Sequence, residues 1–356
     1  MKSTLVSLLV CPTCRHGFNL LAKEVEDSEV IEGSLLCQGC GREISIVTGV
    51  PRFLKDGLNP EQKATADAFG YEWTHYSTLT DADKKEFLAW ISPLTPAGFK
   101  DQIVLDAGCG KGRHTFLAAQ FGARTVVGVD LSDAVDAAFR NTRHLSNAHV
   151  IQADILDLPF KNPFDLAYSI GVIHHLPVPK SGFLALCSHL KPGGRISTWV
   201  YGKEGNLWIE RLVDPIRKNI TSRLPKFITR RLCFLPAVTL FVGLKLLYRP
   251  AKQHGWLKRL LPYSDYLCSI SDYSFSENFW NVFDQLVAPT AFYHSREEVV
   301  DWFKTAEGRH VEIARHNSNS WRGTGLIPTT ATSSQSQRSE ERVFEAGPYR
   351  LIGSEK

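Results

Sequence analysis

The chain has 356 residues, of which 43% are hydrophobic and 22% are charged, so it can bury a core and does not have the composition of a disordered protein. Its formal net charge of +4 is too small by itself to indicate a nucleic-acid-binding protein. The N-terminal segment has one lysine, a short apolar run and Val10 before Cys11, a pattern that does not predict an export signal.

Two pairs of cysteines lie near the N-terminus, Cys11/Cys14 and Cys37/Cys40, and 22 residues separate the pairs. Each pair can present two thiolates to one tetrahedral zinc ion, and four thiolates leave no position for water, so we predict a structural Zn²⁺ site. Residues 1–55 resemble the small zinc-ribbon family that activates RNA and protein methyltransferases, which implies a protein partner at the ribbon. The other cysteines lie among apolar neighbours, as buried thiols do, and this usage predicts a cytoplasmic protein: Cys109, Cys187, Cys233 and Cys268.

Residues 56–100 form a predicted linker with an aromatic cluster, Phe69–Tyr76, and a helix expected at Asp81–Trp90. Two interpretations stay open for this segment. It is either a pair of helices that packs on the next domain or a flap that covers a cofactor.

Residues 101–202 alternate short apolar strands with amphipathic helices, which predicts a Rossmann-like, doubly wound and mostly parallel sheet covered on both faces. The strands are expected at 102–107, 125–130, 150–154, 164–170 and 195–200, and the helices at 113–121, 133–143 and near 181–190.

Residues 203–290 depart from this alternation and predict a basic, apolar helical cap inserted after the fifth strand. Between Arg211 and Arg259 there are twelve Lys or Arg residues against one acid, Asp214. The apolar stretch Phe234–Tyr248 is too short, and too interrupted by Pro236 and Lys245, to predict a bilayer span.

Residues 291–356 are expected to complete the sheet. Ser295 and Glu298 form a predicted capping box at a helix start, followed by a strand at His310–Arg315. The Ser/Thr/Gln-rich segment Thr329–Glu341 predicts a loop, and a last strand is expected at Tyr349–Ile352.

The strand 102–107 ends in a glycine-rich turn with Gly108, Gly110 and Gly112 at alternate positions. A dinucleotide site prefers the wider Gly-x-Gly-x-x-Gly spacing, so that a diphosphate can sit on the helix N-terminus. An acid at Asp106 disfavours a diphosphate, whereas S-adenosylmethionine carries a sulfonium and an ammonium and no phosphate. Charge therefore favours S-adenosylmethionine.

Five ordered motifs resemble those of class I S-adenosylmethionine-dependent methyltransferases, near the ubiquinone/menaquinone-type branch. They cover about 100–202, with a weaker match at 291–316, and imply a seven-stranded sheet. The motifs are Asp106–Gly112, Val127–Ser132, Gln152–Ile155, Phe164–Pro177 and Leu190–Ile196.

The resemblance also implies the cofactor contacts. Asp130 is expected to take both ribose hydroxyls, a task that suits a bidentate acceptor. Asp154 and Ile155 are expected at the adenine edge and Leu131 on its face. The remaining predicted contacts are Asp106, Gly108 and Gly110 at the methionine portion, and Ile170 and Gly171 beside the reacting methyl.

Three histidines are candidates for a catalytic base: His174, His175 and His294. Imidazole titrates near neutrality and can take a proton from an acceptor hydroxyl or acidic carbon. For His175 packing is the stronger explanation, because the family's double histidine after the fourth strand is often structural.

These observations predict methyl transfer to a small-molecule acceptor, either lipid-like or anionic, with the cap in peripheral contact with an anionic membrane. The first alternative is an rRNA or tRNA methyltransferase that docks RNA on the ribbon and cap. Nucleic acid is expected less, because Ser169–Val172 replaces the Asn-Pro-Pro-Tyr type tetrad of base-amine methyltransferases. The second alternative is a non-catalytic S-adenosylmethionine-binding partner protein.

Overall fold

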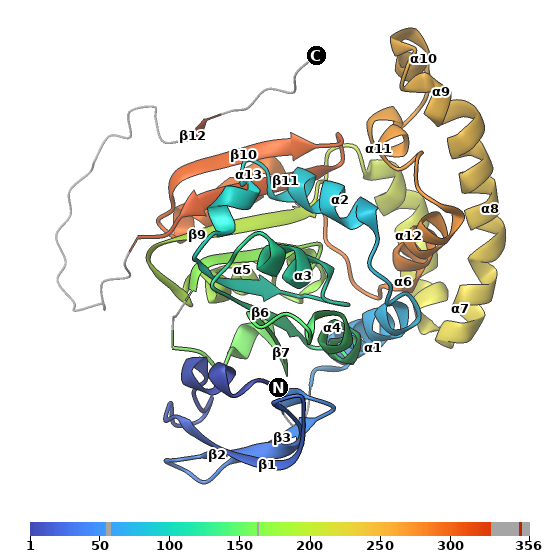
Figure 1. Cartoon of the computed structure of the whole chain (residues 1–356). Helices are drawn as coiled ribbons and strands as arrows, with labels where there is room; N and C mark the ends of the chain where they lie inside the picture. The colour runs from blue at the N-terminus through green and yellow to red at the C-terminus, as the bar shows by residue number, and fades with distance from the viewer. Residues whose placement is uncertain (55–57, 162–163, 329–348, 351–356) are drawn as a thin grey trace.

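The computed structural model describes residues 1–54, 58–161, 164–328 and 349–350. Their strands form one continuous sheet in the order β1-β2-β3-β4-β7-β6-β5-β8-β9-β11-β10-β12. Figure 1 shows the N-terminal strands at one end of this sheet and the cap helices along one side of the molecule.

The central strands are parallel up to β9, and β11 runs antiparallel between β9 and β10. Neighbouring residues on each strand point to opposite faces, so Val104 and Val126 join one core, whereas Leu105 and Val127 join the other. The central strands are β5 (Ile103–Ala107), β6 (Thr125–Asp130), β7 (Ala148–Ala153), β8 (Phe164–Ile170), β9 (Leu190–Tyr201), β10 (Arg309–His316) and β11 (Ser320–Leu326).

Helices cover both faces of these strands, as predicted for a doubly wound sheet. The capping box at Ser295 is confirmed, because its hydroxyl accepts from the Glu298 N–H and Glu298 accepts from the Ser295 N–H. The covering helices are α3 (Arg113–Gln120), α4 (Val135–Thr142), α5 (Pro179–Cys187) and α13 (Arg296–Thr305).

The expected number of seven strands is too small for the continuous sheet. The seven central strands are present, but the four ribbon strands and β12 (Tyr349–Arg350) extend them to twelve in the described part of the chain. The strand β11 has no counterpart among the predicted elements. Its glycines hide it from a pattern analysis, yet they are required, because a Cβ at Gly323 would lie 2.7 Å from the Phe303 ring.

The N-terminal ribbon is an antiparallel meander whose last strand joins the main sheet. The strand β4 pairs parallel with β7, with Arg52 opposite Gln152 and Phe53 opposite Ala153. The ribbon elements are η1 (Ser3–Leu8), β1 (Phe18–Glu26), β2 (Glu29–Cys37), β3 (Glu43–Val47) and β4 (Val50–Phe53).

Two helices follow the ribbon, α1 (Pro60–His75) and α2 (Asp81–Ile91), and a turn η2 (Pro96–Phe99) leads into β5. The aromatic cluster lies on α1, which packs against the cap helix α12. The helix α2 packs on α3 and β9.

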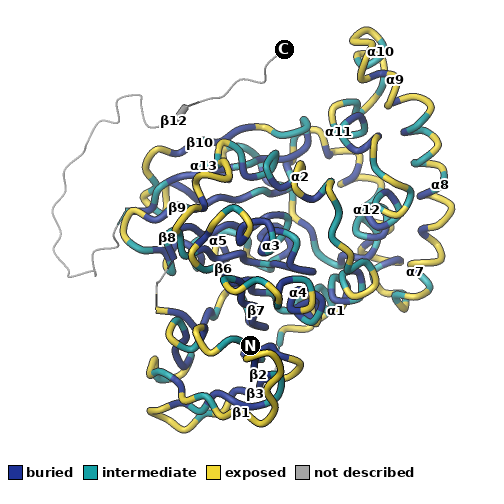
Figure 2. Tube along the Cα trace, viewed as in Figure 1, coloured by how far each residue is buried: buried dark blue, intermediate teal, exposed yellow. Residues whose placement is uncertain are grey.

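The cap lies between β9 and α13. Figure 2 shows α7 and α8 along the outer edge of the molecule with long exposed stretches. The cap elements are η5 (Ile209–Val213), α6 (Asp214–Asn219), η6 (Thr221–Arg223), α7 (Lys226–Leu232), α8 (Phe234–Gly243), η7 (Leu244–Tyr248), α9 (Arg249–Ala251), α10 (Gly255–Leu260), α11 (Ser264–Ser269) and α12 (Phe275–Val287).

The argument from length against a bilayer span in the cap is wrong. Lys226–Ala251 is a single helical run of 26 residues, long and apolar enough by length and composition to cross a membrane. The apolar stretch Phe234–Tyr248 alone is shorter than the helix to which it belongs, so length does not exclude a span. The predicted loop Thr329–Glu341 and residues 351–352 of the predicted last strand lie outside the described residues.

Candidate active site

The glycine turn after β5 has the backbone conformation that the sequence predicted for a close approach to a ligand. Gly108, Gly110 and Gly112 have φ values of +85°, +51° and +81°. A Cβ at Gly108 would lie 2.2 Å from Val172 Cγ2, and one at Gly110 would lie 3.1 Å from the Trp73 ring. Side chains are therefore excluded from this turn by conformation and by space.

Asp106 lies beneath the turn. Its side chain is buried and accepts a hydrogen bond from Thr115 Oγ1 at 2.6 Å. Burial raises the pKa of Asp106 to about 7. The structure does not place Asp106 among the described residues that line the cavity, so a direct contact with a cofactor stays a prediction.

Asp130 ends β6 and faces the glycine turn. Its Oδ2 accepts from the Gly110 N–H at 2.9 Å, and its Oδ1 accepts from the Ser132 N–H and hydroxyl at 2.9 and 2.6 Å. Burial raises the pKa of this carboxyl, and these three donors oppose that shift because they stabilise the charged form. Asp130 and Leu131 both line the cavity.

Asp154 and Ile155 follow β7, at the same edge of the sheet as Asp130. Asp154 caps η3 (Ile155–Asp157) by accepting from the Leu156 N–H at 2.9 Å, and its Oδ2 accepts from Gln62 Nε2 at 3.2 Å. Gln62 belongs to α1. This helix therefore reaches the predicted adenine site.

One cavity joins the predicted cofactor contacts to the cap. Its volume is about 1490 Å³, larger than the roughly 300–1,000 Å³ of a typical ligand pocket. Ile170 and Gly171, at the end of β8, line it together with the glycine turn. The cap contributes side chains from several helices to the same cavity, among them Leu240, Tyr248, Trp280 and Asp284.

The aromatic cluster on α1 forms part of the cavity wall: Phe69, Trp73 and Tyr76. Tyr76 stacks on Trp280 of α12 with ring centroids 5.9 Å apart. Of the two interpretations of this segment, the structure supports a helix that packs on the domain and at the same time covers the predicted cofactor site.

The three candidate histidines lie in different places. His175 lines the cavity, and its Nδ1 lies 2.6 Å from the Thr290 carbonyl oxygen. His174 is fully buried against the Tyr201 ring, and His294 Nδ1 lies 3.5 Å from Glu298 Oε2. Neither His174 nor His294 is among the described residues that line the cavity, so geometry favours His175 of the three.

Burial also weakens these histidines as bases. It lowers the pKa of His175 to about 4 and that of His174 well below its usual value. A neutral imidazole with so low a pKa takes up a proton poorly at neutral pH.

Several carboxyls that the sequence analysis did not single out also line the cavity, among them Glu72 on α1 and Asp284 on α12. Glu72 is 2% exposed, and its Oε2 has no hydrogen-bond partner among the described residues. Burial and the nearby Asp284 carboxyl raise the pKa of Glu72 well above its usual value. Burial also raises the pKa of Asp284 to about 6, although Tyr201 donates its hydroxyl to Asp284 Oδ2 at 3.3 Å.

The only sequence signal for this pair was an isolated acid inside an aromatic or apolar helix segment, Glu72 between Tyr71 and Trp73 and Asp284 after Phe283. A base with a pKa of about 6 is ionised at neutral pH and still accepts a proton readily. Glu86 also lines the cavity, and burial raises its pKa to about 7, but its carboxylate is held in an ion pair with Arg113 at 3.3 Å. Asp284, which has no ion pair among the described residues, is therefore our candidate base.

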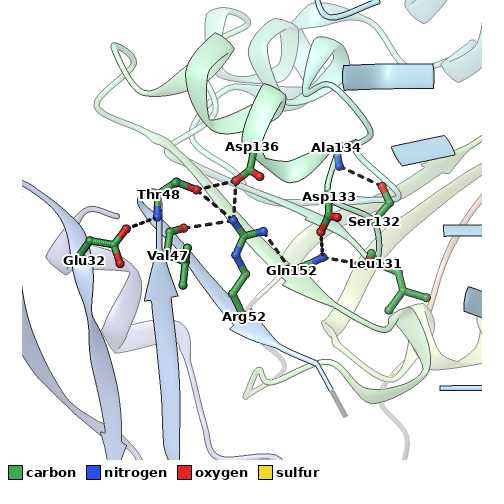
Figure 3. A network of polar contacts seen from close by, with 10 residues as sticks. All are labelled: Glu32, Val47, Thr48, Arg52, Leu131, Ser132, Asp133, Ala134, Asp136 and Gln152. Carbon is green, nitrogen blue, oxygen red and sulfur yellow. Dashed lines mark hydrogen bonds and ion pairs between the residues drawn. The ribbon is translucent and has the colours of Figure 1, made fainter. Parts of the chain in front are cut away.

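The ribbon contacts the predicted adenine site through one arginine (Figure 3). Arg52 Nη1 donates to Gln152 Oε1 at 3.0 Å, and Arg52 Nη2 pairs with Asp136 Oδ1 at 2.5 Å. Gln152 Nε2 in turn donates to the Leu131 carbonyl oxygen at 3.1 Å and to Asp133 Oδ1 at 3.2 Å. The ribbon thus supports the loop that carries Leu131.

We expect Arg52→Ala to weaken cofactor binding about tenfold, because the loop loses hydrogen bonds worth about 1 kcal/mol each that hold Gln152 and α4 in place. Isothermal titration with S-adenosylhomocysteine measures the change. Arg42→Ala is the matched control, because Arg42 lies on the same ribbon and its side chain donates a hydrogen bond only to Thr13 among the described residues. Equal affinities of the two variants would contradict this support role.

The four ribbon cysteines lie together: Cys11, Cys14, Cys37 and Cys40. Their Sγ atoms are all within 4.8 Å of one another, with 3.7 Å between Cys11 and Cys40 and 3.3 Å between Cys14 and Cys37. A tetrahedral ion with bonds of about 2.3 Å needs sulfurs roughly 3.8 Å apart, so this donor set fits zinc.

Comparison with known proteins assigns the central part of the chain. Residues 104–194 match the family model described as a methyltransferase domain. Over these residues the chain is similar to methyltransferases. Four of the five predicted motifs and the observed glycine turn fall within this match, and the fifth motif, Leu190–Ile196, extends beyond its end.

Among the relatives of this chain are two tRNA-modifying enzymes that match about a third of it. The tRNA U34 carboxymethyltransferase of Cellvibrio japonicus is 35% identical over 121 residues, which is 32% of this chain and 38% of that protein. The tRNA U34 carboxymethyltransferase of Psychromonas ingrahamii is 34% identical over 140 residues, or 37% of this chain and 41% of that protein. The chain spans about two fifths of the length of these relatives.

One solved structure similar to this chain is described as a DhpI–SAH complex, with 14% identity, coverage of 75% of this chain and 97% of that one, and a TM-score of 0.46.

The names of the two relatives refer to tRNA. The expectation that nucleic acid is a less favoured partner than a small molecule is therefore not supported.

Proposed function

We propose that this protein transfers a methyl group from S-adenosylmethionine to an acceptor bound in the cavity beneath the cap. The observation that carries the proposal is the shared cavity, which the glycine turn lines on one side and the cap on the other. Its volume of about 1490 Å³ leaves room for a cofactor and a second molecule.

The residues present fit the cofactor. Gly108 and Gly110 present backbone without side chains at the cavity wall, and Asp130 and Asp154 present carboxylates at the ends of adjacent strands. We assign the ribose to Asp130, the adenine to Leu131, Asp154 and Ile155, and the methionine portion to the glycine turn. S-adenosylmethionine supplies an electrophilic methyl on a sulfonium, which needs alignment with a nucleophile and exclusion of water.

Residues of this chain provide that alignment and handle the proton. The aromatic wall from α1 and α12 excludes water from the cavity. Asp284, held by the Tyr201 hydroxyl, receives the proton that an acceptor hydroxyl or acidic carbon loses. His175, the one candidate histidine on the cavity wall, positions the loop after β8 through its contact with the Thr290 carbonyl.

The cap favours an acceptor with a long apolar part. Leu240, Tyr248 and Trp280 line the cavity on the cap side, so apolar surface faces the space beside the cofactor site. A lipid-like acceptor suits this wall.

A tRNA acceptor is the second candidate, and the names of the relatives favour it directly. The match to those relatives covers about a third of this chain. The basic cap, with twelve Lys or Arg between Arg211 and Arg259, supplies positive charge for an RNA backbone.

Incubation of the full-length protein with methyl-labelled S-adenosylmethionine and separate lipid, small-molecule, RNA and protein fractions of a cell extract distinguishes these acceptors. Label in the lipid fraction supports the first candidate, and label in tRNA supports the second. No label in any fraction, with S-adenosylhomocysteine still bound, would point to a non-catalytic binding protein and contradict the proposal.

We further propose that Cys11, Cys14, Cys37 and Cys40 hold a structural zinc ion and that the ribbon serves the methyltransferase domain of its own chain. We expect about one zinc per chain, and we expect chelation to lower the melting temperature because the small ribbon core depends on the ion. Elemental analysis and differential scanning fluorimetry measure both effects. Cys37→Ser should lose the metal and Cys268→Ser should retain it, whereas equal metal content in the two variants would contradict the assignment.

A further inference from the structure

The outer face of the cap helix is apolar and uncovered. Within the run Lys226–Ala251, Leu235 is 72% exposed and Leu246 is 70% exposed. Other large apolar side chains are exposed on the same run and on neighbouring cap elements: Phe227, Leu232, Phe234, Val242, Leu247, Leu212, Ile216, Ile220, Trp256 and Leu260. An uncovered apolar surface of this extent marks a contact with a membrane or another molecule.

The inner face of the same helix packs on the protein. Cys233 and Ala237 are buried, with Cys233 in one cluster with Trp280 and Phe283 of α12. Leu244 and Tyr248 form another cluster with Ile270. The helix is therefore apolar on both sides, but only one side has a partner among the described residues.

The charges are distributed around this apolar face rather than across it. Lys245, in the middle of the run, turns inward, and its Nζ donates to the Ser271 and Tyr273 carbonyl oxygens. The outer face thus carries no described charge between Arg231 and Arg249. Cations that make no ion pair with a described residue lie near its N-terminal end and on adjoining cap elements: Arg231 on the run itself, and Arg211, Arg223 and Arg259 on η5, η6 and α10.

We infer that the outer face of α7, α8 and η7 docks on an anionic lipid bilayer, lying in the headgroup region rather than crossing the membrane. Charge complementarity selects this occupant, because an apolar helix face flanked by unpaired arginines is the pattern of an interfacial helix. Packing of the inner face against α12 opposes a span, since lipid would then have to replace or surround α12. The exposed Trp256 on α10 adds an amphipathic aromatic anchor.

The docking also predicts how a lipid-like acceptor reaches the cavity, and this prediction rests on the proposed function. Pro236, Leu240 and Tyr248 of the same helical run line the cavity. A single helix therefore separates the docked face from the acceptor side of the cavity. Docking would place a lipid-like acceptor within one helix diameter of the methyl-transfer site.

Flotation of the full-length protein with phosphatidylcholine/phosphatidylglycerol vesicles tests the docking without cofactor or acceptor. We expect recovery with these vesicles, less recovery with phosphatidylcholine alone, and a decrease at high salt. Leu235→Glu/Leu246→Glu should weaken binding about 100-fold, because two leucines leave the bilayer. Arg231→Glu should weaken it about fivefold or more. Val25→Glu is the matched control, since Val25 is 58% exposed on β1, which lies in the ribbon away from the cap (Figure 1).

Unchanged S-adenosylhomocysteine affinity shows that each variant is folded. Wild-type protein that does not float, or a Leu235→Glu/Leu246→Glu variant that floats as wild type, would overturn the inference. Resistance of the bound protein to alkaline carbonate extraction would show that the helix spans the membrane instead of docking on it. If the wild type does not bind vesicles but forms a soluble dimer that the leucine variant loses, the occupant of the apolar face is a second copy of the chain and not lipid. If the protein floats with vesicles but transfers no methyl group to any fraction, the docking stands and the proposed function is refuted. If it transfers methyl groups but does not float, the proposed function stands and the docking is refuted.

Discussion

Replacing Asp130 by alanine is expected to weaken binding of S-adenosylmethionine about 100-fold. The carboxylate accepts from Gly110 and Ser132, and we assign its remaining lone pairs to the ribose hydroxyls. Hydrogen bonds to a charged group are worth about 1.5–3 kcal/mol each, and loss of two of them corresponds to a change of this size. Titration calorimetry with S-adenosylmethionine and S-adenosylhomocysteine measures the affinity.

Two further variants test whether the loss of cofactor affinity is specific to the Asp130 carboxylate. Asp301→Asn, on the exposed surface of α13, should bind the cofactor as wild type does. Asp106→Asn removes a buried charge beneath the turn while leaving an acceptor for Thr115, so we expect a smaller effect than in Asp130→Ala. A loss in Asp106→Asn as large as in Asp130→Ala would place Asp106 in contact with the cofactor, as the family resemblance implies.

Replacing Asp284 by asparagine is expected to reduce turnover about 100-fold while cofactor affinity stays the same. A positioned general base contributes about 10²–10⁴-fold, and the amide cannot take up the proton. Stopped assays of labelled methyl transfer, with the acceptor fraction identified above, measure turnover. The matched variant Glu72→Gln tests the other carboxyl of the pair, and a loss in Glu72→Gln alone would transfer the role to Glu72.

The pH profile gives an independent test of the Asp284 role. A base must be ionised to act, so activity should rise with pH through the Asp284 pKa of about 6 and then level off. Tyr201→Phe removes the hydroxyl that stabilises the charged form, so this limb should move to higher pH. A wild-type profile that is flat between pH 5 and about 7 would contradict the assignment.

Much of the fold follows from local sequence signals. The predicted strands at 125–130 and 164–170 coincide with β6 and β8, because β-branched and apolar runs between turn residues are sufficient to specify buried parallel strands. The glycine turn and the Ser295 capping box were also predictable, since positive φ and helix capping depend on a few adjacent residues.

Other features escaped the sequence analysis for physical reasons. The strand β11 has glycines where Phe303 packs, so its hydrophobic pattern is weak although its pairing with β9 is regular. The extension of the sheet by β4 depends on which edge of the ribbon meets β7, and no local pattern encodes that choice. The length of the cap helix was underestimated because Arg230, Arg231 and Lys245 interrupt its apolar composition but not its backbone.

The sequence by itself predicted the glycine turn and the strand ends that we assign to the cofactor, because each is a short motif of residues close together in the chain. Tertiary structure alone brought together the carboxyls on the side of the cavity that we assign to the acceptor. Glu72 and Asp284 come from helices far apart in the sequence. Burial raises both pKa values, and the Asp284 carboxyl raises that of Glu72 further. Desolvation and proximity of distant groups exist only after packing, so no reading of either helix alone could have assigned them.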